Sequence, residues 1–499
     1  MSSELILVVV VLLTTATPVI APATVLVLER TLPLTGVRLE QLKILDRKHL
    51  SMKTNVVEYS LGGTPVLYYT RVKLGTPSKE YTLQFDTGSD LVWVSCTPCA
   101  GCPTSSDPSI KLENYNPDSS STSSRISCFD TMCAHALETG YAICQTSKYS
   151  AIQCGYAETY ADGSAVSGYY VSDTLYFDKV VGQKRVTSSA SIYFGCSNTR
   201  SDQMQIDGII GFGQNAISAI SQLNSQGVSR KVFSHCLRGS KDGSKDGGGI
   251  LVLDEVQRPG VVFTPIVPSQ DNNYYLDMKG IAVNSKNISI DSSLLTTSNT
   301  QGTIVDSGTT LAYLADGVYD PVITAMDDIV HAGSMNSFVM NGSRCYYQNI
   351  SNVSLFPTVT LYFEGGASMT MGPKDYLVPM FNYDGLQDKD PMLCIVFQPS
   401  KGLDNYFQHT TILGDIVFHD KIFIYNLEKK RIGWVNYNCS KLNTNTSFVD
   451  NEPSDYPPVT SDSSELRAPY CSGLIALVAA CIHILRCSNL AISSKRFLQ

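Results

Sequence analysis

Two short motifs in the chain carry residues that could perform acid–base catalysis. The tripeptide Asp-Thr-Gly occupies residues 86–88, and Asp-Ser-Gly occupies residues 306–308. A single tripeptide of this kind is usually a turn, in which Asp accepts from its own backbone and Gly takes a positive φ. Here each copy follows an apolar segment, and each is matched roughly a hundred residues later by two aliphatic residues and a glycine, at 209–211 and 412–414. A period of about 200 residues is too long for a solenoid, so the pattern predicts two homologous lobes with one catalytic loop each.

The two aspartates suggest hydrolysis of a peptide bond by an activated water molecule. Carboxyl groups about 3 Å apart cannot both ionise, so one keeps a proton while the other acts as a base. The base activates the water, and the retained proton is available for the tetrahedral intermediate and the leaving amine. This chemistry requires neither a metal nor a cofactor, and we expect none. We therefore predict that Asp86 and Asp306 meet at the interface between the lobes, below a cleft.

The residues after each aspartate fit this interpretation. The glycine of each motif lets the backbone approach closely. The hydroxyl side chain that follows can donate a hydrogen bond to the outer carboxylate oxygen. These supporting residues are Gly88, Ser89, Gly308 and Thr309.

The segments that position these loops are mostly β-strands. Apolar and polar residues alternate in six runs, at 69–74, 81–85, 169–177, 191–194, 358–363 and 422–425. One helix is predicted with Asp320 as its N-cap and Pro321 at its first position, and with Ile323, Met326 and Val330 on one face. A second, shorter helix is predicted from the spacing of Ile217, Ile220 and Leu223. The sequence thus predicts an all-β protein with a few short helices.

The overall composition agrees with a large folded core in an oxidising compartment. Hydrophobic residues make up 43% of the chain, and charged residues make up 16%, where about 25% is usual. This excludes a disordered or coiled-coil protein. The net charge of −8 without basic blocks argues against a nucleic-acid partner. The 15 cysteines favour the secretory pathway.

The N-terminal part contains predicted targeting and processing segments. Residues 5–13 are all apolar, and the triplet Ala-Pro-Ala at 21–23 resembles a cleavage site, so residues 1–23 are predicted to be a signal peptide. Residues 24–63 are interpreted as a propeptide that is removed or displaced, with a mobile N-terminal extension as the alternative. Six glycosylation sequons support secretion jointly, at Asn287, Asn341, Asn349, Asn352, Asn438 and Asn445.

The C-terminal part follows two predicted lobes, 64–257 and 258–440. A polar linker is predicted at 441–472, followed by a hydrophobic membrane-attachment tail at 473–499. The apolar run 473–485 would cover about 20 Å as a helix, less than the roughly 30 Å of a bilayer core. A signal for a GPI anchor and a short membrane span with Arg486 on the cytoplasmic side both remain open.

From about Leu67 to Cys439 the chain resembles the pepsin family of aspartic proteases. The resemblance rests on the two Asp motifs and on residues 160–164, which match the family's flap motif. It implies a bilobal fold of two β-barrel-like lobes with a central cleft. It also implies an aspartic endopeptidase that acts on proteins or peptides as a monomer. The flap residues that would bind substrate are Tyr160, Asp162, Gly163 and Ser164, and Trp93 would support Tyr160. An inactive, inhibitor-like binding protein on the same fold is the alternative.

The cysteine pattern of the first lobe resembles the cysteine-rich insertion of the nepenthesin-like plant subgroup. The polar linker and the tail are similar to those of members predicted to be GPI-anchored at the cell surface. A zinc or redox site at Cys96-x-x-Cys99-x-x-Cys102 is the alternative, but no histidine lies nearby. The cysteines that carry the resemblance to this insertion are Cys96, Cys99, Cys102, Cys128, Cys133, Cys144 and Cys154.

The number of cysteines predicts a disulfide between the lobes. Nine cysteines lie in the first lobe, the last two being Cys196 and Cys236, and three lie in the second. If all twelve form disulfides, two odd numbers require at least one bridge between the lobes. Cys439 is the expected partner from the second lobe, which leaves Cys345 to pair with Cys394.

Overall fold

The computed structural model describes most of the chain between residues 68 and 441. The described residues are 23–30, 43, 46, 68–103, 112–144, 153–159, 165–181, 184–201, 204–239, 248–269, 271–298, 301–333, 335–340, 342–348, 350–380, 392–403 and 407–441. The chain divides into two compact units, 1–451 and 452–499, and every described residue belongs to the first. The predicted linker beyond residue 441, the tail and nearly all of the signal peptide therefore lie outside the described residues.

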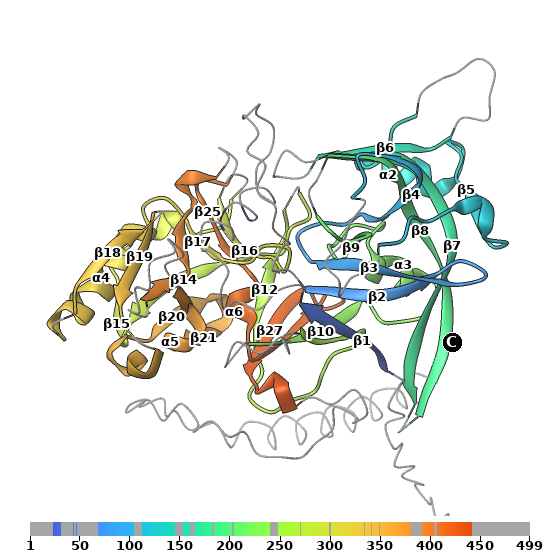
Figure 1. Cartoon of the computed structure of the whole chain (residues 1–499). Helices are drawn as coiled ribbons and strands as arrows, with labels where there is room; N and C mark the ends of the chain where they lie inside the picture. The colour runs from blue at the N-terminus through green and yellow to red at the C-terminus, as the bar shows by residue number, and fades with distance from the viewer. Residues whose placement is uncertain are drawn as a thin grey trace, which may run out of the picture. The chain divides into compact units, whose positions relative to one another are not determined.

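The first half of the chain is built mainly from strands (Figure 1). Its strands are β1 (Ala23–Arg30), β2 (Tyr68–Leu74), β3 (Lys79–Asp86), β4 (Val92–Ala100), β5 (Ser124–Arg125), β6 (Gly155–Thr159), β7 (Ala165–Val181), β8 (Lys184–Arg200), β9 (Gly208–Gly211), β10 (Val232–Arg238) and β11 (Gly248–Val252). Its helices are η1 (Pro117–Ser119), α2 (Thr131–Glu138) and α3 (Ala219–Ser225).

The second half of the chain is also built mainly from strands. Its strands are β12 (Val262–Val267), β13 (Tyr275–Leu276), β14 (Met278–Val283), β15 (Lys286–Asn287), β16 (Gly302–Val305), β17 (Ala312–Leu314), β18 (Ser337–Met340), β19 (Ser343–Tyr347), β20 (Val359–Phe363), β21 (Ser368–Met371), β22 (Leu377–Met380), β23 (Met392–Ile395), β24 (Phe397–Pro399), β25 (Thr410–Leu413), β26 (Lys421–Asn426) and β27 (Arg431–Asn436). Its helices are η2 (Ser292–Leu294), α4 (Tyr319–Ala332), η3 (Ile350–Leu355), η4 (Glu364–Gly366), α5 (Pro373–Tyr376), η5 (Ser400–Gly402), α6 (Asp415–Phe418) and η6 (Cys439–Lys441).

The all-β prediction is confirmed, and each of the six alternating runs lies in a strand. They fall in β2, β3, β7, β8, β20 and β26, although β20 begins one residue later than its pattern, at Val359. Strand β20 shows why the pattern works. Val359, Leu361 and Phe363 are buried between less buried neighbours, because successive side chains of a strand point to opposite faces.

Strand β1 was not predicted, since it lies in the segment interpreted as a propeptide. It pairs antiparallel with β11, from Val25 opposite Val252 to Glu29 opposite Gly248. It also pairs with β2, where Glu29 faces Tyr69. Residues 23–30 therefore form a strand of the main sheet in the unprocessed chain.

Helix α4 corrects one prediction. The helix begins at Tyr319, and Val318 stands at the N-cap position without a side-chain hydrogen bond, so the predicted cap at Asp320 is wrong. Asp320 and Pro321 lie inside the first turn, where N–H groups have no intrahelical acceptor, so proline loses no hydrogen bond there. The predicted apolar face is confirmed, because Ile323, Met326 and Val330 are all buried.

Helix α3 matches its prediction in part. Ser218 is its N-cap, and the side chain of Ser218 accepts from the backbone N–H of Ser221. Ile217 lies before the helix, while Ile220 and Leu223 lie within it, and all three side chains are buried.

Strands from both halves of the chain combine in the main sheet. Strand β10 pairs antiparallel with β26, and Phe233 lies opposite Tyr425. Strand β26 pairs with β27, which pairs in turn with β12. The sheet therefore runs without interruption from one predicted lobe into the other.

Six disulfides join the twelve cysteines between residues 96 and 439. The predicted bridge between the lobes is present as Cys236–Cys439, and Cys345 pairs with Cys394 as expected. A bridge that closes a loop of 203 residues stabilises the fold by on the order of 4 kcal/mol in the chain-entropy model. The other bridges are Cys96–Cys196, Cys99–Cys102, Cys128–Cys144 and Cys133–Cys154.

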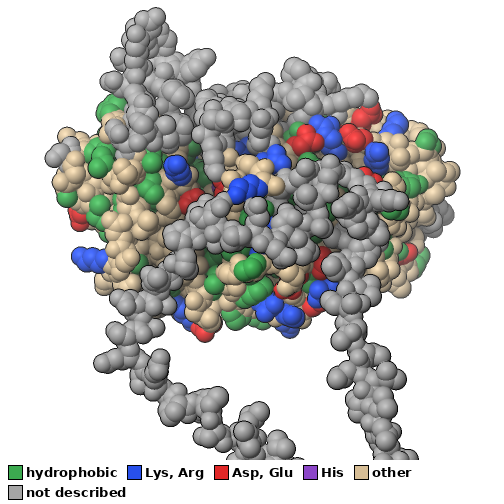
Figure 2. All heavy atoms as spheres, turned by 90° about the horizontal axis from the view of Figure 1, so that it is seen from below, with side chains coloured by type: hydrophobic (Ala, Val, Ile, Leu, Met, Phe, Trp, Pro, Cys, Tyr) green, Lys and Arg blue, Asp and Glu red, His purple; other side chains and the backbone are tan. Residues whose placement is uncertain are grey.

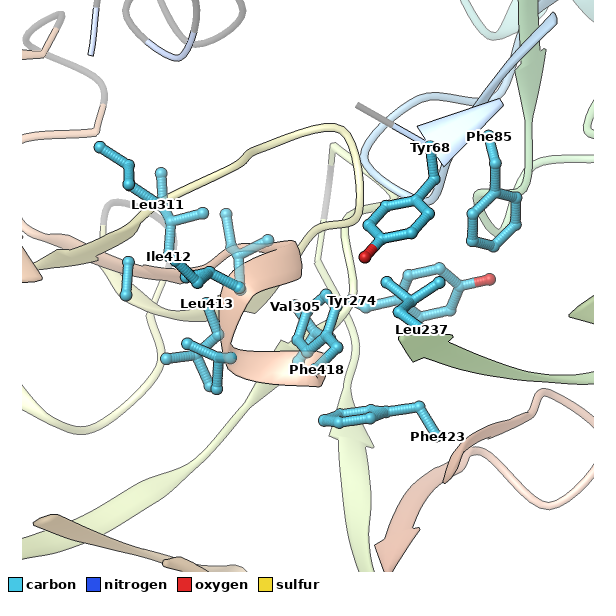
Figure 3. Packing of buried hydrophobic residues seen from close by; sticks show 14 of the residues in the cluster. Tyr68, Phe85, Leu237, Tyr274, Val305, Leu311, Ile412, Leu413, Phe418 and Phe423 are labelled. Atoms are coloured by element: carbon cyan, nitrogen blue, oxygen red, sulfur yellow. The ribbon is translucent and has the colours of Figure 1, made fainter. Parts of the chain in front are cut away.

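The largest hydrophobic core spans both halves of the chain and lies directly under the Asp motifs. Figure 3 shows Phe85, which precedes the first motif, in the same cluster as Val305, which precedes the second. Phe85 packs edge-on against Phe212, with ring centroids 5.2 Å apart, and Phe233 stacks on Tyr425 at 4.4 Å. Burial of each side chain of this size stabilises the folded state by about 1.5–3 kcal/mol. The two motifs are therefore supported by the same stable hydrophobic core.

The surface seen in Figure 2 carries both signs of charge. Lys and Arg side chains are interspersed with Asp and Glu among the described residues of this face, in keeping with the net charge of −8. Among the helices that the structure describes, none is both long and apolar enough to cross a membrane.

Candidate active site

Each Asp motif follows a strand whose position is set by a parallel neighbour. Asp86 is the last residue of β3, which pairs parallel with β9 and places Asp86 opposite Gly211. After the loop the chain returns as β4, which pairs antiparallel with β9. In the second half, β16 pairs parallel with β25, and β17 pairs antiparallel with β25. The two halves thus share one topology around their motifs, and the aliphatic-aliphatic-Gly segments predicted from the repeat are the central strands.

The two loops are linked by a reciprocal pair of hydrogen bonds. The backbone N–H of Thr87 donates to Ser307 Oγ at 3.0 Å, and the backbone N–H of Ser307 donates to Thr87 Oγ1 at 2.9 Å. Ser307 Oγ in turn donates to the carbonyl of Phe85 at 3.2 Å. Both hydroxyl residues are fully buried. Residues 220 positions apart are therefore held in one rigid arrangement.

The carboxyl groups of both aspartates are bound in the same way. Gly88 N–H donates to Asp86 Oδ1 at 2.8 Å, and Ser89 Oγ donates to Asp86 Oδ2 at 2.6 Å. In the second loop, Gly308 N–H donates to Asp306 Oδ1 at 2.7 Å, and Thr309 Oγ1 donates to Asp306 Oδ2 at 2.5 Å. The interactions expected of Ser89 and Thr309 are present in the structure.

The two carboxyl groups meet at Gly88. A Cβ atom placed on Gly88 would lie 2.5 Å from Asp306 Oδ1 and 2.9 Å from Asp306 Oδ2. The N–H of the same glycine binds Asp86. Asp86 is 0% exposed and Asp306 is 3% exposed. The structure thus brings together the two aspartates that the sequence predicted, and a side chain at position 88 would separate them.

A third carboxyl group lies behind the second loop. Asp415, at the start of α6, is buried, and its backbone N–H donates to the carbonyl of Thr309 at 2.7 Å. Burial raises the pKa of Asp415 well above its usual value. The positive charge of Arg30 lowers this pKa, while the carboxyl groups of Asp46 and Asp306 raise it further. Asp415 therefore favours its neutral form, which limits the negative charge next to Asp306.

Two described residues of the predicted propeptide, Lys43 and Asp46, are buried, at 2% and 1% exposed. Asp46 contacts this region. The carboxylate of Asp46 accepts from the N–H groups of Thr310 and Leu311, both at 2.7 Å, and from the Tyr313 hydroxyl at 3.2 Å. The contact adjoins the loop that carries Asp306. Sequence reasoning did not predict it.

The predicted flap residues Tyr160, Asp162, Gly163 and Ser164 lie outside the described residues. The strands on either side of them, β6 and β7, pair antiparallel up to Thr159 opposite Ala165. Trp93, predicted to support Tyr160, lies in β4 and is fully buried. The Arg200 guanidinium lies over its ring at 4.9 Å. The predicted contact of Trp93 with Tyr160 also falls outside the described part.

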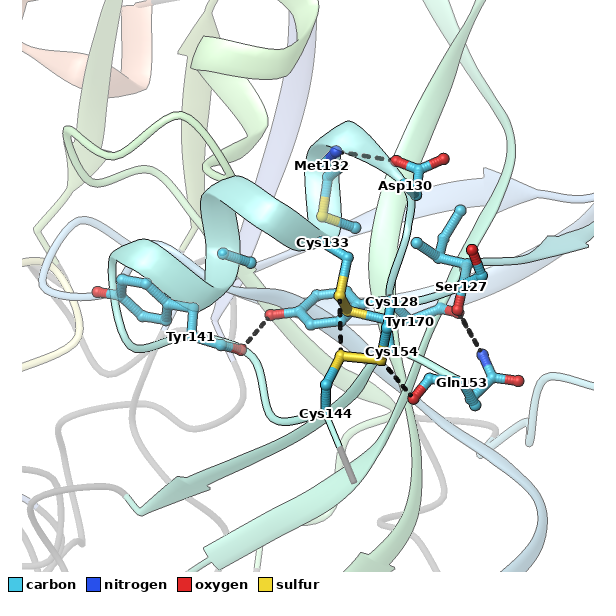
Figure 4. Close-up of a disulfide and its surroundings, with 12 residues drawn as sticks. Ser127, Cys128, Asp130, Met132, Cys133, Tyr141, Cys144, Gln153, Cys154 and Tyr170 are labelled. Atoms are coloured by element: carbon cyan, nitrogen blue, oxygen red, sulfur yellow. Dashed lines mark hydrogen bonds between the residues drawn. A yellow bond between two sulfur atoms is a disulfide. The ribbon is translucent and has the colours of Figure 1, made fainter. Parts of the chain in front are cut away.

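The cysteine-rich insertion forms a compact module beside the first loop. Figure 4 shows Cys128–Cys144 and Cys133–Cys154 packed together next to α2. The sulfur atoms of Cys128, Cys133 and Cys144 lie within 4.8 Å of one another. Since these sulfur atoms are bonded in disulfides, they hold the module together and are not thiolate ligands for a metal. Cys96, Cys99 and Cys102, where a zinc or redox site was the alternative, are likewise paired in disulfides.

Three of the six sequons fall within the described residues. Asn287 is exposed at the end of β15, Asn438 is partly buried, and Asn352 lies in η3. Asn341, Asn349 and Asn445 lie outside the described residues.

Two family models match the chain, one in each half. The model described as xylanase inhibitor N-terminal matches residues 68–253, and the model described as xylanase inhibitor C-terminal matches residues 273–436. The first match contains Asp86 and the second contains Asp306.

Several plant proteinases are similar to the chain. Aspartic proteinase 36 of Arabidopsis thaliana is 35% identical over 418 residues, which cover 81% of this chain and 81% of that protein. Aspartic proteinase nepenthesin-2 of Nepenthes gracilis is 27% identical over 379 residues, which cover 74% of this chain and 78% of that protein.

Solved structures share the fold at low sequence identity. The crystal structure of edgp matches with a TM-score of 0.61 and 16% identity, covering 84% of this chain and 95% of that one. Basic 7S globulin from soybean matches with a TM-score of 0.59 and 16% identity, covering 85% of this chain and 99% of that one. These likenesses establish the fold, which is the pepsin-like arrangement of two related halves.

Proposed function

Because the chain belongs to the pepsin-like family of plant aspartic proteases, we propose that it is an active aspartic endopeptidase. Its substrates would be proteins or peptides. The observation that carries the proposal is the meeting of two hydrogen-bonded carboxyl groups at Gly88, where Asp306 packs and Asp86 is bound.

In the proposed mechanism, Asp86 and Asp306 share one proton and hold a water molecule between them. The ionised carboxylate removes a proton from the water, which attacks the carbonyl carbon of the substrate. The proton held by the other aspartate goes to the carbonyl oxygen, and a proton then passes to the leaving amine. Ser89 and Thr309 donate to the outer oxygens, and so stabilise the ionised form and fix the orientation of each carboxyl group.

The competing function is an inhibitor-like binding protein without activity. It is favoured by the match to the two xylanase inhibitor models. The complete pair of aspartates, with both glycines and both hydroxyl partners in place, favours the protease. The measurement that distinguishes the two functions is peptide cleavage.

The experiment is to incubate the purified protein with a peptide library from pH 2.5 to pH 7. We expect cleavage of internal bonds with a bell-shaped pH dependence and an acidic optimum. At low pH both carboxyl groups are protonated and no base remains, and at high pH the shared proton is lost. A statine-type transition-state mimic should inhibit, and a metal chelator should have no effect. A folded protein that binds a glycosidase but cleaves no peptide at any pH would support the competing function.

We further propose that residues 24–63 are a propeptide and that the protein enters the secretory pathway and attaches to a membrane through residues 473–499. The burial of Asp46 against Thr310 and Leu311 supports a docked propeptide over a mobile extension. The cysteine pairing supports an oxidising compartment, and the apolar run after a polar linker supports attachment.

Expression of the full chain in plant cells would test processing and location together. We expect a mature N-terminus after Asp46, and a membrane-bound protein that phosphatidylinositol-specific phospholipase releases. A mature chain that still contains Asp46 would contradict the propeptide. Protein that is soluble without the phospholipase would contradict attachment, and retention after treatment would favour a short membrane span.

A further inference from the structure

The first catalytic loop rests on the segment that follows β9. Phe212 N–H donates to the carbonyl of Asp86 at 2.7 Å, and Gly213 N–H donates to the carbonyl of Ser89 at 2.9 Å. Asp90 follows directly after Ser89 and is only 2% exposed. The mechanism above does not use this buried carboxyl group, although it is four residues from Asp86.

Both oxygens of Asp90 are hydrogen-bonded, each to a different part of the fold. The backbone N–H of Asn215 donates to Oδ1 at 2.8 Å, and the hydroxyl of Tyr141 donates to Oδ2 at 2.7 Å. A Cβ atom on Gly213 would lie 2.3 Å from Asp90 Oδ1. The carboxyl group therefore sits in a close-fitting site formed by two separate segments, residues 213–215 and Tyr141.

Tyr141 belongs to the disulfide-linked module. It follows α2, inside the loops closed by both Cys128–Cys144 and Cys133–Cys154, and its side chain points away from the sulfur atoms (Figure 4). The backbone of Tyr141 is held as well, since its carbonyl accepts from the Tyr170 hydroxyl at 2.8 Å. The module thus presents the Tyr141 hydroxyl to Asp90 from a rigid support.

We propose that Asp90 is a positioning residue for the first catalytic aspartate. By joining the loop to Asn215 and Tyr141, Asp90 fixes the adjacent Ser89, and Ser89 orients the carboxyl group of Asp86 through the 2.6 Å hydrogen bond to Oδ2. The cysteine-rich module is then part of the catalytic framework. This inference rests on the proposed function, since positioning matters for catalysis only if the aspartates act together.

The second loop has no carboxylate of its own at the corresponding position. Four residues after Asp306 stands Thr310, where the first loop has Asp90. The two halves are therefore equivalent in the residues that touch the reacting carboxyl groups and differ in the support behind them.

The charged groups around Asp90 determine its protonation. Burial raises the pKa of Asp90 to about 6, against the hydrogen bonds from Tyr141 and Asn215. Asp86 raises it further and Lys231 lowers it, while Glu158 and the tyrosines at 141 and 274 also face it. Below pH 6 Asp90 is mainly neutral, so an asparagine should replace it well under the acidic conditions at which the enzyme is expected to work.

The test compares kcat, KM and hydrogen exchange for three variants of the purified enzyme at pH 4. Asp90→Ala should lower kcat about 30-fold with KM within about twofold of the wild type, because the substrate cleft is intact and the carboxyl group is misaligned. Tyr141→Phe should lower kcat about fivefold. Asp90→Asn should keep at least about half of the activity. Exchange of the amides at 86–93 should be about tenfold faster in Asp90→Ala and Tyr141→Phe.

The matched control is Tyr115→Phe, which removes another buried Tyr–Asp hydrogen bond of the same half, at 2.5 Å from Asp173. It should lower the melting temperature as much as Tyr141→Phe without changing kcat or the exchange at 86–93. The inference is overturned if Asp90→Ala and Tyr141→Phe behave like this control, or if Asp90→Asn is no better than Asp90→Ala. If the wild type is inactive, the proposed function is refuted but this inference is not. The hydrogen-exchange measurement then decides whether Asp90 holds the loop.

Discussion

Asp86→Asn and Asp306→Asn should each abolish peptide cleavage while the protein remains folded. Asn has the shape of Asp but cannot serve as the base or hold the shared proton. The turnover number should fall by a factor of about 10⁴, as for other residues that act as a unit in catalysis. The double variant should be no worse than either single variant, because the loss of one member already destroys the pair. The measurement is cleavage of a fluorogenic peptide across the acidic pH range, together with circular dichroism.

A suitable control is Asp327→Asn, which is the same substitution at a buried aspartate of α4. Asp327 pairs with Arg344 at 3.0 Å and accepts from the Tyr346 hydroxyl, so its replacement affects stability more than chemistry. Tyr160→Ala should weaken catalysis less than either change in the pair, because the flap positions the substrate and transfers no proton. A correctly folded Asp306→Asn protein that cleaved peptides at the wild-type rate would show the paired mechanism to be wrong.

Gly88→Ala should reduce activity at least about 100-fold with only a modest loss of stability. The new methyl group would lie 2.5 Å from Asp306 Oδ1, well inside van der Waals contact, so the two carboxyl groups must move apart. Overpacking of this kind costs about 1–3 kcal/mol of folding free energy. A small displacement of reacting groups is enough to account for the loss in rate. Activity and the free energy of unfolding in urea are measured on the same preparation.

The matched control for this substitution is Gly280→Ala in β14. The nearest atom to a Cβ at Gly280 is Tyr362 Cδ2 at 3.9 Å, which is ordinary contact. This variant should keep wild-type activity. Binding of a statine-type mimic should fall in Gly88→Ala and not in Gly280→Ala. Full activity in Gly88→Ala would mean that Asp306 does not approach the first loop as closely as described.

The sequence alone determined the presence of two related halves and the identity of the two aspartates that we propose as the catalytic pair. Asp86 and Asp306 could be found because each lies in a local pattern that repeats along the chain, and a repeated pattern is visible without a structure. The disulfide between the halves followed from counting, since nine and three cysteines cannot pair completely within their own halves. Strands such as β20 were predicted because one residue in two must face the core.

Only the tertiary structure decided how the loops are locked and supported. The reciprocal hydrogen bonds between Thr87 and Ser307 join residues 220 positions apart, and the hydrogen bond between Asp46 and Thr310 joins residues 264 positions apart. The Asp90–Tyr141 hydrogen bond joins the loop to the disulfide module. Periodicity reports which face of an element is buried, but it carries no information about which polar side chains meet across that interface. Such hydrogen bonds exist only once the core has brought their partners together, and for that reason they could not be predicted from the order of the residues.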